Sequence, residues 1–191
     1  GVFSFYPTKT IGAMGDAGAI VTDSDELAQV LRSLRQYGWD QDRLSRCSGQ
    51  NSRMDALQAA ILCLRLAGFE EEFERRQLIA QRYLDVLALQ QHIDAPGTLS
   101  DVTHGYHQFV VQCKGRDALA AALADAGVES GRHYIRPVHA HPAYVRLHRA
   151  DSLAEVEKLY DRMLSIPVYP ELEDEEVDVI CHTLATWTGE Y

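Results

Sequence analysis

The stretch from Phe3 to Thr22 reads FSFYPTKTIGAMGDAGAIVT and contains a single lysine. Lys9 is the only charged residue among the first fifteen, and apolar, aromatic-rich segments flank it. Their β-branched and aromatic residues predict one strand over residues 1–8 and another over Gly18–Thr22. The glycines between them predict a tight connection. Lys9 is therefore expected at the end of a short strand.

A lysine in this position has two interpretations. Between apolar strands it is partly removed from water, which favours the neutral amine, and a neutral amine can form a Schiff base with a carbonyl group. Alternatively, the aliphatic part of Lys9 covers an edge strand while its ammonium group stays in water. The residues alone leave both interpretations open.

Composition limits the class of protein. The chain has 191 residues and a formal net charge of −10, and no block rich in Lys or Arg occurs, which argues against nucleic-acid binding. No run of about eighteen apolar residues occurs, so no membrane span is expected. Four cysteines without a CxxC pair predict a reduced, cytoplasmic protein. Gly1 opens directly into the first expected strand, which suggests a fragment or a processed chain.

The remaining pattern alternates helices and strands. Helices are expected over residues 24–37, 53–67, 69–89, 117–126, 153–164 and 174–187, with a long loop over 39–52 and extended segments over 106–113 and 166–170. A composition change near residue 90 divides the chain into two α/β pieces, 1–90 and 91–191.

Two polar clusters are candidates for binding. Asn51 lies in GQNSR, just before an expected helix, where Asn and Ser are either caps or part of an anion site. The loop over residues 130–143 is dense in His, Tyr and Arg, which suits an anionic, hydroxylated ligand but also a solvated surface loop. The eight histidines form no HExxH motif, and no metal site is expected.

Together these stretches resemble the DegT/DnrJ/EryC1/StrS family of sugar aminotransferases, which use pyridoxal 5'-phosphate (PLP). The matching segments occur in the family's order: SFYPTKTIGAMGDAGAIVT, GQNSRMDALQAAIL, AGVESGRHYIRPVHAHPAY and LSIPVYPELEDEEVDVI. The resemblance implies an α/β, aspartate-aminotransferase-like fold (fold type I of PLP enzymes). Residues 1–90 would be the C-terminal part of the large PLP-binding domain, and residues 91–191 the small C-terminal domain.

The resemblance also implies roles for individual residues. Lys9 matches the lysine that forms the Schiff base with PLP, and Ser4 matches the serine that hydrogen-bonds the PLP phosphate. Asn51 matches an asparagine that reaches the phosphate bound by the partner subunit, so a homodimer with shared active sites is expected. Three further residues match positions that line the family's sugar pocket: Tyr6, His133 and Tyr134.

The implied activity is transfer of an amino group from glutamate or glutamine to a keto group of a nucleotide-linked sugar. Two alternatives remain at this point. One is an aminotransferase acting on an aminocyclitol precursor. The other is a non-catalytic fragment that only docks, because family members have a longer stretch before the lysine, which supplies the aspartate under the pyridine nitrogen.

Overall fold

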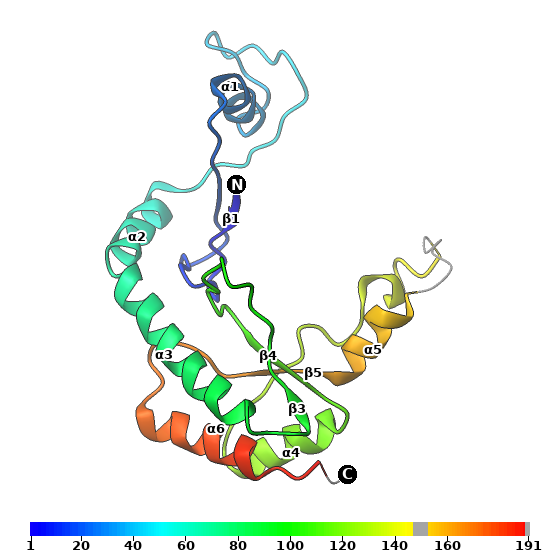
Figure 1. Cartoon of the computed structure of the whole chain (residues 1–191). Helices are drawn as coiled ribbons and strands as arrows, with labels where there is room; N and C mark the ends of the chain where they lie inside the picture. Colours follow the sequence, from blue (N-terminus) through cyan, green and yellow to red (C-terminus); the bar gives the residue numbers. More distant parts are fainter. Residues whose placement is uncertain (147–152, 190–191) are drawn as a thin grey trace. The chain divides into compact units, whose positions relative to one another are not determined.

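The structure is a computed structural model and describes residues 1–146 and 153–189. The chain forms two compact units, Gly1–Glu71 and Glu72–Tyr191, and Figure 1 labels most of their elements. Contacts divide the chain inside a long helix, about twenty residues before the predicted boundary at residue 90. The reason is that this helix, α3 (Phe69–Leu87), buries Ile79, Ala80 and Tyr83 in the core of the second unit. The assignment of domains as large and small stays a prediction.

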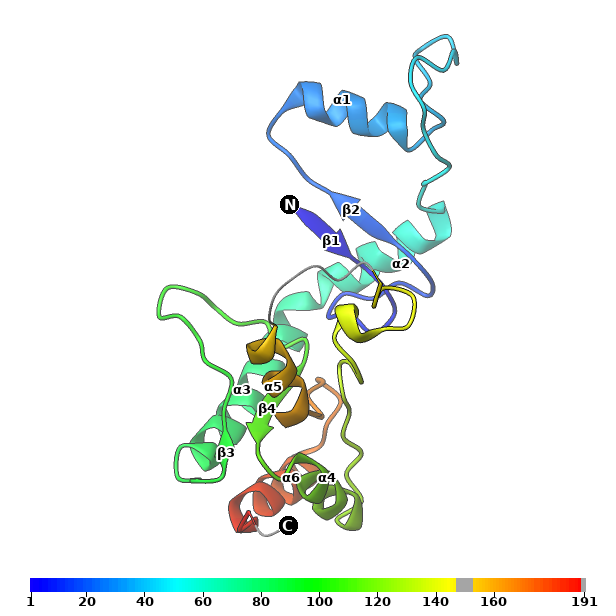
Figure 2. The same cartoon turned by 90° about the vertical axis from the view of Figure 1, so that its right-hand side faces the viewer.

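The first unit contains a two-stranded antiparallel sheet and two helices. β1 (Val2–Ser4) pairs with β2 (Gly18–Ile20), and Ser4 lies opposite Gly18; Figure 2 shows the two strands side by side. α1 (Asp25–Leu34) begins where the acidic cluster predicts a helix start, because the Ser24 side chain accepts a hydrogen bond from the Leu27 N–H. α2 (Ala56–Ala67) follows a long loop.

The connection between β1 and β2 covers residues 5–17 and is not the tight turn that the glycines predict. It folds back on itself at Gly12, where an added Cβ would lie 2.4 Å from the Pro7 carbonyl oxygen. α2 holds this connection at two points. Arg65 Nη1 donates to the Gly12 carbonyl (3.0 Å), and Gln58 Oε1 accepts from the Met14 N–H (2.9 Å). Lys9 therefore lies in a loop anchored to a helix, and not at a strand end.

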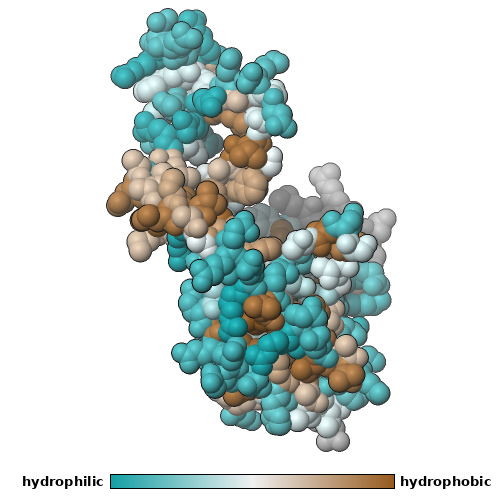
Figure 3. All heavy atoms as spheres, turned by 60° about the vertical axis from the view of Figure 1, so that its left-hand side comes forward, coloured by the Kyte–Doolittle hydropathy of each residue, from teal (hydrophilic) through white to brown (hydrophobic). Residues whose placement is uncertain are grey.

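The first unit buries little of its apolar surface. Its buried hydrophobic residues are Ala13 and Leu62, whereas Val2, Leu57 and Leu64 are 82%, 74% and 78% exposed. Figure 3 shows hydrophobic residues gathered on the outside of this unit. A surface this apolar is typical of a face that packs against further polypeptide.

The second unit contains a three-stranded antiparallel sheet with the order β3–β4–β5. Its elements are β3 (Ile93–Asp94), β4 (Phe109–Cys113), α4 (Arg116–Asp125), η1 (Val138–Ala140), α5 (Ala154–Arg162), β5 (Met163–Ile166) and α6 (Asp174–Thr186). The core joins residues of α3, α4 and α6 to alternate residues of β4. This arrangement follows the predicted helices closely, and it adds β3, which is too short to give a sequence signal.

The helix expected over residues 153–164 ends at Arg162. Residues 163–166 instead pair with β4 in the register Phe109↔Ile166 and Gln112↔Met163. Leu164 and Ile166 are buried there. Pairing with the central strand therefore overrides the local helical pattern.

None of the helices within residues 1–146 and 153–189 is both long enough and apolar enough to cross a membrane. The same residues contain no group of three or more His, Cys, Asp or Glu side chains that could hold a metal ion.

The free thiols are expected to differ strongly in reactivity. Cys47 is exposed, whereas Cys113 is buried in β4, and burial raises the pKa of the Cys113 thiol from 9.0 to about 11. At pH 8 this shift lowers the thiolate fraction roughly 100-fold, and only the thiolate reacts. Iodoacetamide labelling followed by peptide mass spectrometry should modify Cys47 at least about 100 times faster than Cys113. Equal labelling rates in the native protein would contradict the burial of β4.

Candidate active site

Local hydrogen bonds connect three of the predicted site residues in the first unit. The Lys9 backbone N–H donates to the Tyr6 carbonyl (2.8 Å), and the Tyr6 N–H donates to Ser4 Oγ (3.3 Å). These bonds close a turn immediately after β1. The structure thus brings Ser4, Tyr6 and Lys9 together in one short segment, as the spacing in the sequence suggests.

The donors in this segment suit an anionic ligand. Ser4 uses an acceptor lone pair of its hydroxyl for the Tyr6 N–H, and its own O–H can still donate. Ser4 is exposed and Lys9 is half-buried. An exposed hydroxyl donor and an amine, five residues apart on a connection that α2 anchors, can bind a molecule that carries both a phosphate and a carbonyl group.

Asn51 lies in the loop between α1 and α2 of the same unit. It forms an antiparallel bridge with Gln36, and Arg53 Nε donates to its Oδ1 at 3.0 Å. This bond uses the amide oxygen and leaves the amide NH₂ free to donate to another group. Within residues 1–71, all of which the structure describes, that NH₂ has no hydrogen-bond partner. The interpretation of Asn51 as a helix cap is wrong, because the N-cap of α2 is Asp55.

The predicted irregular loop is well ordered by its own hydrogen bonds. The Asp40 carboxylate accepts from the backbone N–H groups of Asp42 and Leu44 and from Arg46 Nε, at 2.9, 2.9 and 2.6 Å. The bond from Leu44 is the main reason that the pKa of Asp40 lies below its usual range, and the bond from Arg46 is the second. Arg53 also lies over the Tyr37 ring. The loop that carries Asn51 is therefore held in a defined conformation by these contacts.

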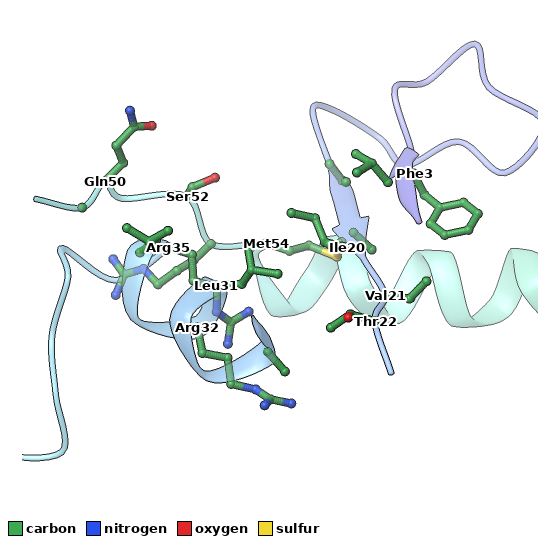
Figure 4. Close-up of a pocket in the computed structure, with 18 of the residues that line it drawn as sticks. Phe3, Ile20, Val21, Thr22, Leu31, Arg32, Arg35, Gln50, Ser52 and Met54 are labelled. Atoms are coloured by element: carbon green, nitrogen blue, oxygen red, sulfur yellow. The ribbon is translucent and has the colours of Figure 1, made fainter. Parts of the chain in front are cut away.

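A hollow of about 1310 Å³ opens on the first unit, but its lining does not include Ser4, Tyr6, Lys9 or Asn51. Figure 4 shows Phe3, Ile20 and Met54 beside it, together with Arg32 of α1 and Arg35, which follows the last residue of α1. This lining is mostly apolar and offers few groups for catalysis. The functional groups after β1, and not the hollow, mark the candidate site.

His133 and Tyr134 lie in the second unit, in the loop between α4 and η1. Their rings form an edge-to-face pair with centroids 5.7 Å apart, and both residues are exposed. His133 Nδ1 lies 2.9 Å from the hydroxyl of Ser165 on β5. Arg132, next to them, is bound to Asp117 on α4. That ion pair makes Arg132 an anchor of the loop.

Asp117 on α4 holds the first part of this loop through Arg132. It accepts hydrogen bonds from Arg116 Nε (2.8 Å) and from Arg132 Nη2. The Arg116 bond is the main reason that the pKa of Asp117 lies below its usual range. Neither Asp117 nor Ser165 was a predicted site residue. The only signal for Ser165 was a polar residue inside the apolar run LSIPV, and Asp117 gave none beyond a helix start.

Comparison with known proteins identifies the family. The model of the DegT/DnrJ/EryC1/StrS aminotransferase family matches residues 1–185. The erythromycin biosynthesis sensory transduction protein EryC1 of Saccharopolyspora erythraea is 40% identical over 188 residues, or 95% of this chain and 50% of that protein. The dTDP-3-amino-3,4,6-trideoxy-alpha-D-glucose transaminase of Streptomyces venezuelae is 39% identical over 186 residues, or 97% of this chain and 49% of that protein.

A solved structure gives the same result for the fold. The crystal structure of S. venezuelae DesV in complex with a ketimine intermediate superposes with a TM-score of 0.93 at 36% identity, over 100% of this chain and 52% of that chain. The chain spans about half the length of the curated relatives it matches. The predicted aspartate-aminotransferase-like fold class is confirmed, and the chain belongs to the DegT/DnrJ/EryC1/StrS aminotransferase family.

Proposed function

We propose that the protein is a PLP-dependent aminotransferase of the cytoplasm. It moves an amino group from glutamate or glutamine to a keto group of a nucleotide-linked sugar. The observation that carries the proposal is the hydrogen-bonded segment Ser4–Tyr6–Lys9, which places a hydroxyl donor and an amine on one turn held by α2. The family and the transaminase name of the S. venezuelae relative support this activity.

The residues present fit PLP by the chemistry of their donors. The Ser4 hydroxyl and the Asn51 amide would hold the phosphate, because both offer donors and neither adds negative charge. The Lys9 amine would hold the aldehyde carbon. When bound, PLP supplies an electron sink that lets an amino group leave one carbon and join another.

Lys9 is the residue that moves the proton in this proposal. Its Nζ takes the proton from the carbon that loses an amino group and returns it to the carbon that gains one. Tyr6 supports this position through its backbone carbonyl, which accepts from the Lys9 N–H at 2.8 Å. Arg65 and Gln58 anchor the connection that carries Lys9, at Gly12 and at Met14.

The substrate proposal assigns the sugar to Tyr6, His133 and Tyr134. Hydroxyl and imidazole groups suit sugar hydroxyls, and an exposed Tyr134 ring at 69% can cover an apolar sugar face. The S. venezuelae relative is named as a transaminase of a dTDP-linked aminosugar. A nucleotide-linked keto sugar is therefore the substrate class that we propose.

A homodimer with shared sites is the third part of the proposal. α2 exposes Leu57, Leu64 and Leu66, and apolar helix faces of this kind are typical of subunit interfaces. Asn51 precedes this helix, and its amide NH₂ makes no hydrogen bond within residues 1–71. We also propose the division into domains: residues 1–90 belong to the large PLP-binding domain, and residues 91–191 form the small C-terminal domain.

The activity can be tested with the full-length protein and PLP. Glutamate or glutamine should convert the cofactor's absorbance band from the pyridoxal to the pyridoxamine form, and a dTDP- or UDP-linked keto sugar should reverse the change. Conversion by the amino donor without reversal by any keto sugar would reject the substrate class. Absence of both changes would reject the activity.

Replacing His133 should impair sugar binding selectively. His133→Ala removes one neutral hydrogen bond, about 1 kcal/mol, so the KM for the keto sugar should rise roughly fivefold. The reaction with the amino donor should be unchanged in stopped-flow measurements. His182→Ala, an exposed histidine on α6, is the matched control. Equal impairment of both half-reactions would assign His133 to the cofactor or to the fold.

A further inference from the structure

Ser165 is a buried polar residue in the central sheet of the second unit. It is 7% exposed and lies on β5 between Leu164 and Ile166, which are 1% and 3% exposed. A buried hydroxyl is costly unless it makes a hydrogen bond. The hydroxyl of Ser165 lies 2.9 Å from His133 Nδ1, so the histidine loop satisfies it.

The backbone fixes the same contact. The Gly131 N–H donates to the Ser165 carbonyl (2.9 Å), and the Ser165 N–H donates to the Gly131 carbonyl (2.8 Å). This pair of bonds joins the loop to β5 two residues before His133. An added Cβ on Gly131 would lie 3.0 Å from His133 Cε1, a distance that real Cβ atoms rarely tolerate. The imidazole is thus held by the Ser165 hydroxyl at Nδ1 and packed closely against Gly131.

This arrangement leaves one ring nitrogen of His133 for a ligand. Nδ1 is engaged with Ser165, and Nε2 has no hydrogen-bond partner within residues 1–146 and 153–189. A hydroxyl can either donate to Nδ1 or accept from it, so the contact fixes where Nδ1 lies and thereby where Nε2 points. A cavity of about 650 Å³ is lined by His133 and Ser165, together with Tyr169 and Glu129, so a ligand can approach beside the pair.

We propose that Ser165 is a positioning residue for sugar recognition. It holds the His133 ring in one orientation, so that Nε2 already faces the substrate before the substrate binds. This proposal rests on the proposed function, in which His133 contacts the keto sugar. Ser165 itself does not touch the substrate, and its effect on sugar binding passes entirely through His133.

The contact itself can be tested without any enzymatic reaction. The full-length protein, labelled with ¹⁵N-histidine, should give a His133 Nδ1 shift that reflects its hydrogen bond to Ser165. In Ser165→Ala the Nδ1 shift should change, because that hydrogen bond is lost. Unchanged shifts in Ser165→Ala would show that the hydroxyl does not hold the ring and would overturn the proposal.

Kinetics test whether the effect passes through His133. Ser165→Ala should raise the KM for the keto sugar about three- to fivefold, with kcat and the amino-donor half-reaction nearly unchanged. In a His133→Ala background the same substitution should cause no further rise, because residues in one network are non-additive. A second full rise in the double variant would mean that Ser165 acts on the fold, and the proposal would fail.

Two further variants keep the test decisive if Ser165→Ala is unstable. Ser165→Thr retains the hydroxyl and should restore both the KM and the His133 Nδ1 shift. Gly131→Ala leaves Ser165 intact but crowds the ring, and it should reproduce the raised KM. If Gly131→Ala leaves the KM unchanged, the ring position does not matter and the proposal is wrong. If His133→Ala alone has no effect on the KM, the proposed function fails instead, while the NMR result still reports on the Ser165 contact.

Discussion

Lys9→Ala is expected to abolish both the covalent link to PLP and amino transfer. The lysine amine is the only group of the Ser4–Tyr6–Lys9 segment that can bond to the aldehyde carbon, and it also moves the proton. Loss of a positioned general base alone costs a factor of roughly 10² to 10⁴ in rate. Borohydride reduction followed by peptide mass spectrometry should find the cofactor on Lys9 in the natural protein and no adduct in the variant.

Two controls separate chemistry from charge and from fold. Lys9→Arg keeps a cation in the turn but cannot supply a neutral amine, so it should be as inactive as Lys9→Ala. Lys114→Ala removes an exposed lysine just after β4 and should keep full activity and the adduct. An adduct on another lysine, or full activity in Lys9→Ala, would contradict the proposal. A natural protein that takes up no PLP would favour the non-catalytic alternative.

The parts of the fold that local chemistry determines could be predicted from the sequence. The acids and Ser24 at the start of α1 predict its beginning, and the structure confirms a side-chain cap there. Strands at both ends of the first quoted stretch are confirmed, because their β-branched and aromatic residues allow few other structures. The family resemblance then supplied the fold class, which the similar structures confirm.

The parts that depend on distant partners could not be predicted. Met163 and Leu164 continue a helical pattern, and only pairing with β4 makes them a strand. The long connection after β1 depends on Gln58 and Arg65, about fifty residues away, so the glycines alone suggested a shorter turn. Long-range contacts of this kind leave no periodic signal in the chain.

The candidate site divides in the same way. Ser4 and Lys9 are five residues apart, and local hydrogen bonds through Tyr6 connect them, so sequence spacing was sufficient. Ser165 is thirty-two residues from His133, and their contact depends on the register between β5 and the loop. The residues that could not be predicted are therefore those, such as Ser165, that contact a functional side chain carried by a different element.

Asn51→Ala is expected to weaken the retention of PLP strongly. A hydrogen bond to a charged group contributes about 1.5–3 kcal/mol, so the Kd for the cofactor should rise roughly 10- to 150-fold. Asn51→Asp is the sharper variant. It keeps an oxygen for Arg53, which donates to Oδ1 at 3.0 Å, but replaces the NH₂ donor with a negative charge facing the phosphate. Its Kd should rise more than that of Asn51→Ala, and Ser52→Ala should bind PLP normally.

The shared site of the proposed dimer can be tested by mixing two inactive variants. A heterodimer of Lys9→Ala with Asn51→Asp has one site that combines the intact Lys9 of one subunit with the intact Asn51 of the other. If Asn51 serves the neighbouring subunit, this site should bind PLP tightly and restore up to half of the natural activity per dimer. If Asn51 serves its own subunit, the intact lysine is always paired with the altered asparagine. Recovery should then be absent, and equilibrium dialysis of the purified heterodimer with PLP distinguishes the two arrangements before any substrate is added.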